Sequence, residues 1–354
     1  GLVDRLSMTT IIINMYNINI VVMPGEDTWN VLLPDKIHGV GPEYIKDFVS
    51  FTSVSEYGKS ESELIPHIQK YDAVILRTAE LTEKVINKAD NLKIIAKHGA
   101  GLDNVDINVA SENNIVVCNT PGMNSRAVAE HAVTLIMATR RNLLLADKNV
   151  RYGEWAKTRS DWERFRRSEI HGDVLGLLAF GSIAREVANI ALGLGMECVT
   201  YDPYISDEDL PSGINRVDNQ TELFERSDVV SVHVPLTEET HHSIGINEFR
   251  ALGPDGIIIN TARGGVIDEN DLITALRERV IMGAGLDVLE QEPPSENNPL
   301  LKSKKTIITP HCGGISLEAT YNMSLEASKN VKNVYEGELP DSTINGDKIN
   351  VHLG

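Results

Sequence analysis

The chain has 354 residues, which predicts two domains at ~150 residues each. Its 33 basic and 51 acidic residues give a formal net charge of −18, which argues against binding to nucleic acid or to an anionic membrane surface. Hydrophobic residues (42%) and charged residues (24%) occur at globular frequencies, so a largely disordered chain is excluded.

The segment from Leu6 to Gly25 carries no charge, which raises the question of a signal peptide or a membrane helix. Three amides, Asn14, Asn17 and Asn19, interrupt its apolar residues, and no small-x-small cleavage site follows. We interpret it as a leader that runs into a first strand over Asn19–Met23. We therefore expect a soluble protein without a membrane partner.

Short apolar runs of strand length then alternate with amphipathic stretches of helical length. In the first third, the further predicted strands are Ala73–Leu76, Leu92–Ala96 and Ile115–Cys118, and the predicted helices are Pro42–Phe48, Ser60–Gln69, Glu83–Ala89 and Val105–Glu112. One long helix is predicted from Ser125 to about Tyr152, because no glycine or proline interrupts it. The later predicted strands are Val174–Ala179, Cys198–Tyr201, Val229–Val232, Gly256–Asn260 and Gly283–Leu286. This alternation of strands and helices predicts an α/β fold with two doubly wound parallel sheets.

The first chemical signature is the turn after the strand that begins at Val174. It reads Ala179-Phe180-Gly181-Ser182-Ile183-Ala184, and Asp202 lies at the end of the next strand. This spacing is typical of a dinucleotide-binding unit, in which a helix N-terminus receives the pyrophosphate and a carboxylate receives the ribose diol. Ala179 departs from the G-x-G-x-x-G/A pattern, so a strand–turn–helix without a ligand stays open on this motif alone. Asp202, with no lysine or arginine among residues 203–208, favours NAD over NADP.

Arg263, Glu292 and His311 each lie in a loop that follows a predicted strand. Each could be an ordinary loop residue by itself. Together they form the set that reversible hydride transfer to a 2-keto acid needs. The arginine binds the substrate carboxylate and polarises the carbonyl, the histidine donates the proton, and the carboxylate orients the histidine and raises its pKa.

These loops resemble the D-isomer-specific 2-hydroxyacid dehydrogenase family, in its phosphoglycerate dehydrogenase-like branch without a regulatory tail. The resemblance runs from about Ala73 to about Gly337. Besides the loops, it is carried by Lys97-His98-Gly99-Ala100-Gly101-Leu102-Asp103-Asn104-Val105-Asp106, Asn119-Thr120-Pro121-Gly122 and Asp202-Pro203-Tyr204. It implies an NAD-dependent enzyme that acts on a small D-2-hydroxy or 2-keto acid, either 3-phosphoglycerate-like or hydroxypyruvate/glyoxylate-like.

The resemblance also implies a role for each matching residue. It makes Arg263, Glu292 and His311 catalytic. The implied cofactor-binding residues are Gly181, Ser182, Ile183, Asp202, Val234, Thr261, Ala262, Asp287, Gly313 and Gly314, with Asp287 at the nicotinamide carboxamide. The implied substrate-binding residues are Arg77, Ala100 and Gly101.

The same resemblance implies the domain organisation. It predicts a flavodoxin-like substrate domain over residues 1–120, completed by residues 315–354, and a Rossmann NAD-binding domain over residues 121–314. It also implies a homodimer that is joined through the NAD-binding domains.

Some positions leave alternatives open. Asp173-Val174 stands where the family usually has a lysine-threonine pair, and Arg77 could bind a phosphate or simply end a strand. His241-His242 is expected to be solvated at a helix start. The three cysteines, Cys118, Cys198 and Cys312, are far apart, so we expect no disulfide, no metal site and a reducing cytoplasm.

A second class of function stays open on the same fold. Some relatives act as NAD(H)-sensing corepressors, and sensing relatives can retain the same arginine, glutamate and histidine. The sequence does not identify which 2-hydroxy acid is the substrate.

Overall fold

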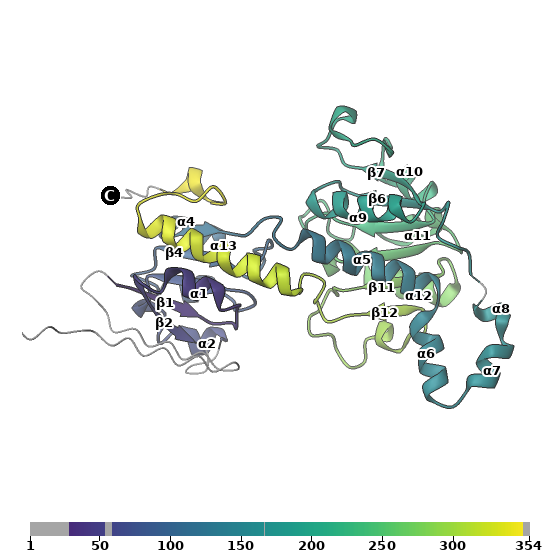
Figure 1. Ribbon diagram of the computed structural model, residues 1–354, viewed down its shortest axis with the longest axis horizontal. Coiled ribbons are helices and arrows are strands. Elements are labelled where there is room, and N and C mark those ends of the chain that lie inside the picture. Colours follow the sequence, from purple (N-terminus) through teal and green to yellow (C-terminus); the bar gives the residue numbers. More distant parts are fainter. Residues whose placement is uncertain (1–27, 54–58, 166, 350–354) are drawn as a thin grey trace, which may run out of the picture. The chain divides into compact units, whose positions relative to one another are not determined.

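The computed structural model describes residues 28–53, 59–165 and 167–349 (Figure 1). The chain divides into two compact units. Unit 1 comprises Gly1–Asn124 and Ser316–Gly354, and unit 2 comprises Ser125–Ile315. The predicted leader and its strand over residues 19–23 lie outside the described residues. None of the helices in the described ranges combines the length and apolarity that crossing a bilayer requires.

Unit 1 is built on a five-stranded parallel sheet in the order β2-β1-β3-β4-β5. The strands are β1 (Trp29–Leu33), β2 (Val49–Ser53), β3 (Ala73–Leu76), β4 (Ile94–Lys97) and β5 (Val116–Cys118). The helices are α1 (Val40–Ile45), α2 (Glu61–Leu64), α3 (Glu83–Ile86), α4 (Ile107–Glu112) and α13 (Leu317–Tyr335). Alternate strand residues point to opposite faces, so Val74 packs on the side of α2, α3 and α4, and Ile75 on the side of α1 and α13.

Residues 316–349 complete unit 1, because α13 buries Ala327, Val331 and Val334 in its core. Beyond this helix, the side chain of Asn345 is buried and binds the segment around β5. Its Oδ1 accepts from the Val117 backbone N–H (2.9 Å), and its Nδ2 donates to the Ile115 carbonyl (2.9 Å) and to Ser111 Oγ (3.1 Å).

We expect Asn345→Ala to lower the free energy of unfolding of unit 1 by about 2 kcal/mol, because it leaves a buried N–H and a buried carbonyl without partners. Urea denaturation followed by circular dichroism measures this loss. Asn108→Ala, at an exposed position of α4, is the control and should change stability by less than ~0.5 kcal/mol. Equal midpoints for the two variants would contradict the role given to Asn345.

Unit 2 is built on a seven-stranded parallel sheet in the order β12-β11-β10-β9-β6-β7-β8. The strands are β6 (Val174–Leu178), β7 (Glu197–Tyr201), β8 (Ile214–Arg216), β9 (Val229–Val232), β10 (Ile257–Asn260), β11 (Gly283–Leu286) and β12 (Thr306–Ile308). The helices are α5 (Ser125–Arg140), α6 (Leu143–Arg151), α7 (Trp155–Ser160), α8 (Trp162–Phe165), α9 (Ser182–Gly193), α10 (Gln220–Glu225), α11 (Ile246–Leu252) and α12 (Glu269–Glu278). One face of the sheet packs against α5 and α9, and the other against α10, α11 and α12. The predicted α/β fold with two doubly wound parallel sheets is confirmed.

The predicted single helix from Ser125 to Tyr152 is wrong, because α5 ends at Arg140 and α6 begins at Leu143. Asn142 between them adopts a left-handed conformation (φ 49°, ψ 36°), which asparagine tolerates better than most residues. The cause is packing: α5 buries one face in the core of unit 2, whereas α6 has no buried residue. In Figure 1, α6, α7 and α8 form an arm that extends from the rest of unit 2.

Candidate active site

The turn after β6 has the backbone of a glycine-rich turn, although an alanine occupies its first position. Ala179 has φ +73°, in the left-handed region that favours glycine, and its N–H donates to the Tyr201 carbonyl at the end of β7 (2.8 Å). Gly181 follows as the N-cap of α9, the 12-residue helix that continues from the turn. The sequence motif is therefore a strand–turn–helix unit in the structure.

The space in front of this turn fits a dinucleotide. A Cβ placed on Gly181 would have no other atom within 4 Å, so the helix N-terminus is open for a pyrophosphate. Asp202 lies beside it at the end of β7, with its carboxylate oxygens fixed by the N–H groups of Phe180 and Tyr204 (both 2.9 Å). Both features match what a pyrophosphate and a ribose diol require.

The structure shows two arginines beside the loop that follows Asp202, and both come from outside residues 203–208 of the sequence. Arg185 on α9 donates to the Asp209 carbonyl (3.2 Å). Arg216 on β8 donates to the Ile205 carbonyl (2.9 Å) and pairs with Asp207 (3.2 Å). Each guanidinium thus forms a hydrogen bond with the loop that follows Asp202, and acidic side chains of this loop lie near both arginines.

We expect Ala179→Gly to stabilise unit 2 by about 1 kcal/mol, because the variant removes a Cβ from a left-handed residue. We also expect NADH to bind about fivefold more tightly, since the turn can then approach the pyrophosphate more closely. Thermal unfolding and nicotinamide fluorescence measure the two effects. Ala179→Val should act in the opposite direction, and a glycine variant that is no more stable and binds NADH no better would contradict this reading.

His311 and Glu292 form a hydrogen-bonded pair at the carboxyl edge of the same sheet. His311 Nδ1 lies 2.7 Å from Glu292 Oε2, and Glu292 Oε1 accepts from the Leu289 N–H (3.1 Å). The bond to Glu292 raises the pKa of His311, against the opposing effect of burial. Burial alone would raise the pKa of Glu292, but the bonds from His311 and Leu289 lower it. The arrangement therefore favours a carboxylate beside an imidazolium.

A cavity of about 390 Å³ lies against this pair. Its lining comes from the loop after β11 and from β12 with the loop that follows it, and comprises Asp287, Leu289, Glu292, Pro293, Pro294, Ile308, Thr309, Pro310 and His311. The structure thus brings the predicted glutamate and histidine to one cavity of unit 2.

Arg263 lies near this pair, in the loop after β10. Its backbone carbonyl accepts from the Asn260 side chain (2.9 Å), and its Nη1 donates to the Ala262 carbonyl (2.6 Å). Its positive charge acts to lower the pKa of His311, which opposes the larger effect of Glu292. β10, β11 and β12 are neighbours in the sheet, so the three predicted catalytic residues meet at one edge.

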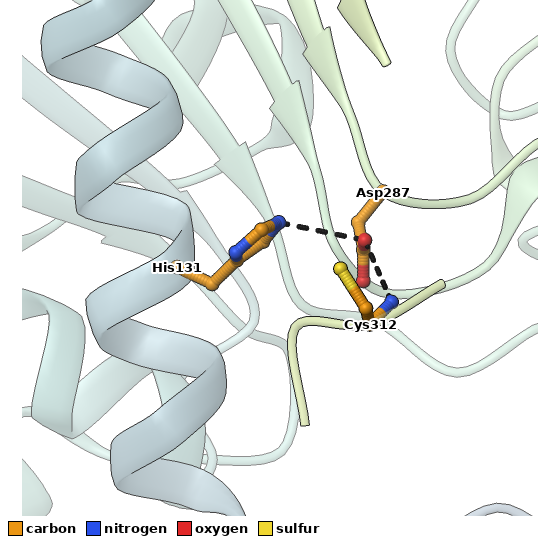
Figure 2. Close-up of side chains that lie close together, drawn as sticks. All are labelled: His131, Asp287 and Cys312. Carbon is orange, nitrogen blue, oxygen red and sulfur yellow. Dashed lines mark hydrogen bonds and ion pairs between the residues drawn. The ribbon is translucent and has the colours of Figure 1, made fainter. Parts of the chain in front are cut away.

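Asp287 lies at the end of β11 and is almost completely buried. Its carboxylate accepts from Thr309 Oγ1 (2.6 Å) and from the N–H groups of Cys312 (2.9 Å) and Gly313 (2.8 Å). His131 on α5 lies 3.4 Å from the same carboxylate (Figure 2). Burial alone would raise the pKa of Asp287, but these hydrogen bonds lower it.

The other predicted cofactor residues of unit 2 surround these groups. Thr261 is buried, and its Oγ1 has no hydrogen-bond partner among the described residues. Ser182 Oγ accepts from Ser125 Oγ (2.9 Å) at the start of α9. Ile183, Val234, Ala262 and Gly314 are partly exposed, and Gly313 is buried.

The predicted substrate-binding residues lie in unit 1. Arg77 follows β3, and its N–H, with those of Thr78 and Ala79, donates to the buried carboxylate of Asp35 (2.8, 2.8 and 3.0 Å). This role of Asp35 was not predicted, because nothing in the local sequence pattern indicates it. In the loop after β4, Ala100 is exposed and Gly101 half-buried.

The prediction for His241-His242 is partly wrong. The two rings are stacked with centroids 3.9 Å apart, and they lie in a turn before α11 rather than at a helix start. His242 Nε2 lies 2.8 Å from Glu290 Oε1 and its Nδ1 lies 3.6 Å from Asp268, so it is bound by carboxylates rather than merely solvated.

Comparison with known proteins agrees with this geometry. Residues 133–313 match the model of the family described as "D-isomer specific 2-hydroxyacid dehydrogenase, NAD binding domain". The chain is 39% identical over 294 residues to the D-3-phosphoglycerate dehydrogenase of Methanocaldococcus jannaschii, covering 82% of this chain and 55% of that protein. It is 39% identical over 293 residues to the glyoxylate reductase of Thermococcus litoralis, covering 81% and 87%.

Among solved structures, the chain resembles the NADPH-dependent glyoxylate/hydroxypyruvate reductase of Sinorhizobium meliloti. The TM-score is 0.78 at 26% sequence identity, over 89% of this chain and 97% of that one. The chain spans only about half the length of the D-3-phosphoglycerate dehydrogenases that it matches.

Proposed function

Because the chain belongs to the D-isomer-specific 2-hydroxyacid dehydrogenase family and contains its NAD-binding domain, we propose that it is an NAD-dependent oxidoreductase. Its proposed substrates are small D-2-hydroxy acids and the corresponding 2-keto acids, of the hydroxypyruvate/glyoxylate or 3-phosphoglycerate type. The observation that carries this proposal is the His311–Glu292 pair, 2.7 Å apart, at a sheet edge shared with Arg263.

The proposed mechanism assigns one task to each of these residues. Bound nicotinamide supplies the hydride for reduction and accepts it in oxidation. Arg263 binds the substrate carboxylate and polarises the carbonyl. His311 gives a proton from Nε2 to the carbonyl oxygen, while Glu292 holds Nδ1 and stabilises the imidazolium.

We propose that the turn at Gly181, Ser182 and Ile183 holds the pyrophosphate and that Asp202 holds the adenosine ribose. Val234, Thr261, Ala262, Asp287, Gly313 and Gly314 would then surround the nicotinamide. NAD is preferred over NADP because the Asp202 carboxylate repels a 2′-phosphate, and because Arg185 and Arg216 are bonded to the carbonyl groups of the neighbouring loop. Equal KM values for NADH and NADPH would contradict this preference.

We propose that unit 1 is the substrate domain and unit 2 the NAD-binding domain. The proposed substrate-binding residues of unit 1 are Arg77, Ala100 and Gly101, because they match the family resemblance. Arg77 is partly buried, its Nε is buried without a hydrogen-bond partner among the described residues, and the Asp35-bound loop fixes its backbone. These features support an anion-binding role for this part of unit 1.

We further propose a cytoplasmic homodimer that is joined through the NAD-binding domains. The arm of unit 2 supports this, since several of its large apolar side chains are exposed: Leu143 (58%), Leu144 (53%), Tyr152 (76%) and Trp155 (62%). Light scattering after size-exclusion chromatography should give twice the mass of one chain.

The deciding experiment follows NADH absorbance with hydroxypyruvate, glyoxylate, pyruvate and phosphohydroxypyruvate. We expect oxidation of NADH with at least one of them, and the rates identify the substrate. NADH binding without turnover of any of the four would contradict the enzyme proposal. It would favour an NAD(H)-sensing protein of the corepressor type, which sequence analysis left open.

A further inference from the structure

Three side chains at the proposed nicotinamide site form a group of metal-ligand types, and the proposed function gives a role only to Asp287 among them. His131 comes from α5, Asp287 from the end of β11, and Cys312 from the loop after β12 (Figure 2). One nitrogen, one oxygen and one sulfur atom of these residues all lie within 4.8 Å of one another. No metal site was predicted from the sequence, because its three cysteines are far apart along the chain.

The donor atoms and their spacing suit a zinc ion. Imidazole nitrogen, thiolate sulfur and carboxylate oxygen are the three kinds of protein ligand that Zn²⁺ prefers. His131 Nε2 and Asp287 Oδ1 lie 3.4 Å apart. Two ligands at ~2.1 Å from a tetrahedral ion are separated by about 3.4 Å, so this pair already has the required spacing.

The packing keeps the group close together. A Cβ on Gly313 would lie 2.9 Å from Asp287 Oδ2 and 3.1 Å from His131 Cδ2, so only glycine lets the loop pass this near. Asp287 is buried, whereas Cys312 and His131 keep partial access to solvent. A small cation can therefore reach a carboxylate that is otherwise shielded.

The hydrogen bonds around the three side chains show where the protons on the ligand atoms lie before a metal ion binds. Thr309 Oγ1 donates to Asp287, so His131 Nε2 carries the proton that faces Thr309 Oγ1 (2.9 Å). The Cys312 thiol has to lose its proton before the sulfur can bind a metal ion, because the thiolate is the ligand form. When Zn²⁺ binds, a Zn–S bond replaces the S–H bond, the thiol proton leaves to solvent, and the His131 proton moves to Nδ1.

We propose that His131, Asp287 and Cys312 bind one Zn²⁺ ion, with water as the fourth ligand. The ion takes Asp287 away from the contacts that fix the loop bearing His311, so it inhibits the proposed dehydrogenase. Only this inhibitory effect rests on the proposed function. The binding itself does not.

The first test measures binding without nucleotide or substrate. Protein stripped with EDTA is titrated with ZnCl₂ by calorimetry and against a chromophoric chelator, and Co²⁺ is used as a spectroscopic probe of thiolate ligation. We expect one Zn²⁺ per chain, one proton released, and a thiolate-to-cobalt absorption band. Mg²⁺ should not compete, because it prefers a site made of oxygen ligands alone.

Matched variants locate the site. Cys312→Ser and His131→Gln should each weaken Zn²⁺ binding about a hundredfold or more, and Cys312→Ser should abolish the cobalt band. His242→Gln is the control, because His242 is another histidine beside carboxylates. Circular dichroism confirms that each variant is folded. No stoichiometric uptake, uptake unchanged in Cys312→Ser, or uptake lost in His242→Gln would overturn the proposal.

The second test applies if the wild-type protein reduces a keto acid. Zn²⁺ should then inhibit, EDTA should restore the rate, and Cys312→Ser should resist Zn²⁺ relative to its own metal-free rate. Inhibition that persists in Cys312→Ser would overturn the inhibitory role. Without any turnover, the proposed function fails while the binding test still decides the metal site.

Discussion

Arg263→Ala is expected to lower kcat/KM for the best keto acid about a hundredfold or more, while NADH affinity stays within about twofold. The reason is that the guanidinium has to bind a carboxylate and stabilise charge on the carbonyl oxygen, and the other proposed substrate-binding residues are not assigned the second task. A hundredfold loss corresponds to about 2.7 kcal/mol of transition-state stabilisation. Steady-state kinetics and nicotinamide fluorescence measure the two quantities.

Two further substitutions make the result specific to this guanidinium. Arg263→Lys keeps the positive charge but loses the planar fork, so it should remain well below wild type. Arg277→Ala removes an exposed arginine of α12 and should leave the rate unchanged. If Arg263→Ala retains more than about a tenth of wild-type activity, the assignment of Arg263 is wrong.

Glu292→Gln is expected to move the pH profiles of keto-acid reduction and of hydroxy-acid oxidation to lower pH, and to slow reduction about tenfold or more near neutrality. Glu292 raises the pKa of His311, with a smaller contribution in the same direction from Asp287, and Arg263 acts against them. Removing the carboxylate therefore lowers this pKa. Reduction needs protonated His311, so in the variant the decline of its rate with rising pH begins at a lower pH. Oxidation needs the neutral ring, so its rise with pH also begins at a lower pH.

The measurement is kcat/KM against pH in both directions, in buffers that contain EDTA. Glu290→Gln is the matched control. Glu290 lies two positions before Glu292, and its carboxylate binds His242 rather than His311, so the variant removes the same charge from a different histidine. A profile that shifts equally in both variants would show a general charge effect. A profile that shifts in neither would separate Glu292 from the proton donor.

The central strands were predictable because each is a short, fully buried apolar run. Ala73–Leu76, Val229–Val232 and Gly283–Leu286 coincide with β3, β9 and β11. Two edge strands, β2 and β8, were not predicted, because they are half-exposed and polar residues interrupt their apolar pattern. The edge strand β5 was predicted, because all of its residues are buried. β1, over Trp29–Leu33, was missed because the apolar run over residues 19–23 was taken as the first strand.

Some residues of the candidate site could likewise be predicted from the sequence, and others could not. Arg263, Glu292 and His311 could be named because each lies in a loop directly after a strand, and parallel strands bring such loops to one edge. His131 could not, because it lies on a helix whose pattern indicates only an apolar face. Arg216 was also missed, since its approach to the loop after Asp202 depends on the pairing of β8 with β7.

Unit 2 lies within the sequence of unit 1, and this has a consequence for folding during synthesis on the ribosome. The core of unit 1 needs α13, and its β5 segment needs Asn345, so the sheet that is translated first stays incomplete until residue 345 has been made. All of unit 2 is available once residue 315 has emerged. We therefore expect unit 2 to fold first, which reverses the usual order in which the N-terminal domain leads. Nascent chains arrested shortly after residue 315 should contain a protease-resistant fragment from unit 2, while the strands of unit 1 remain cleavable.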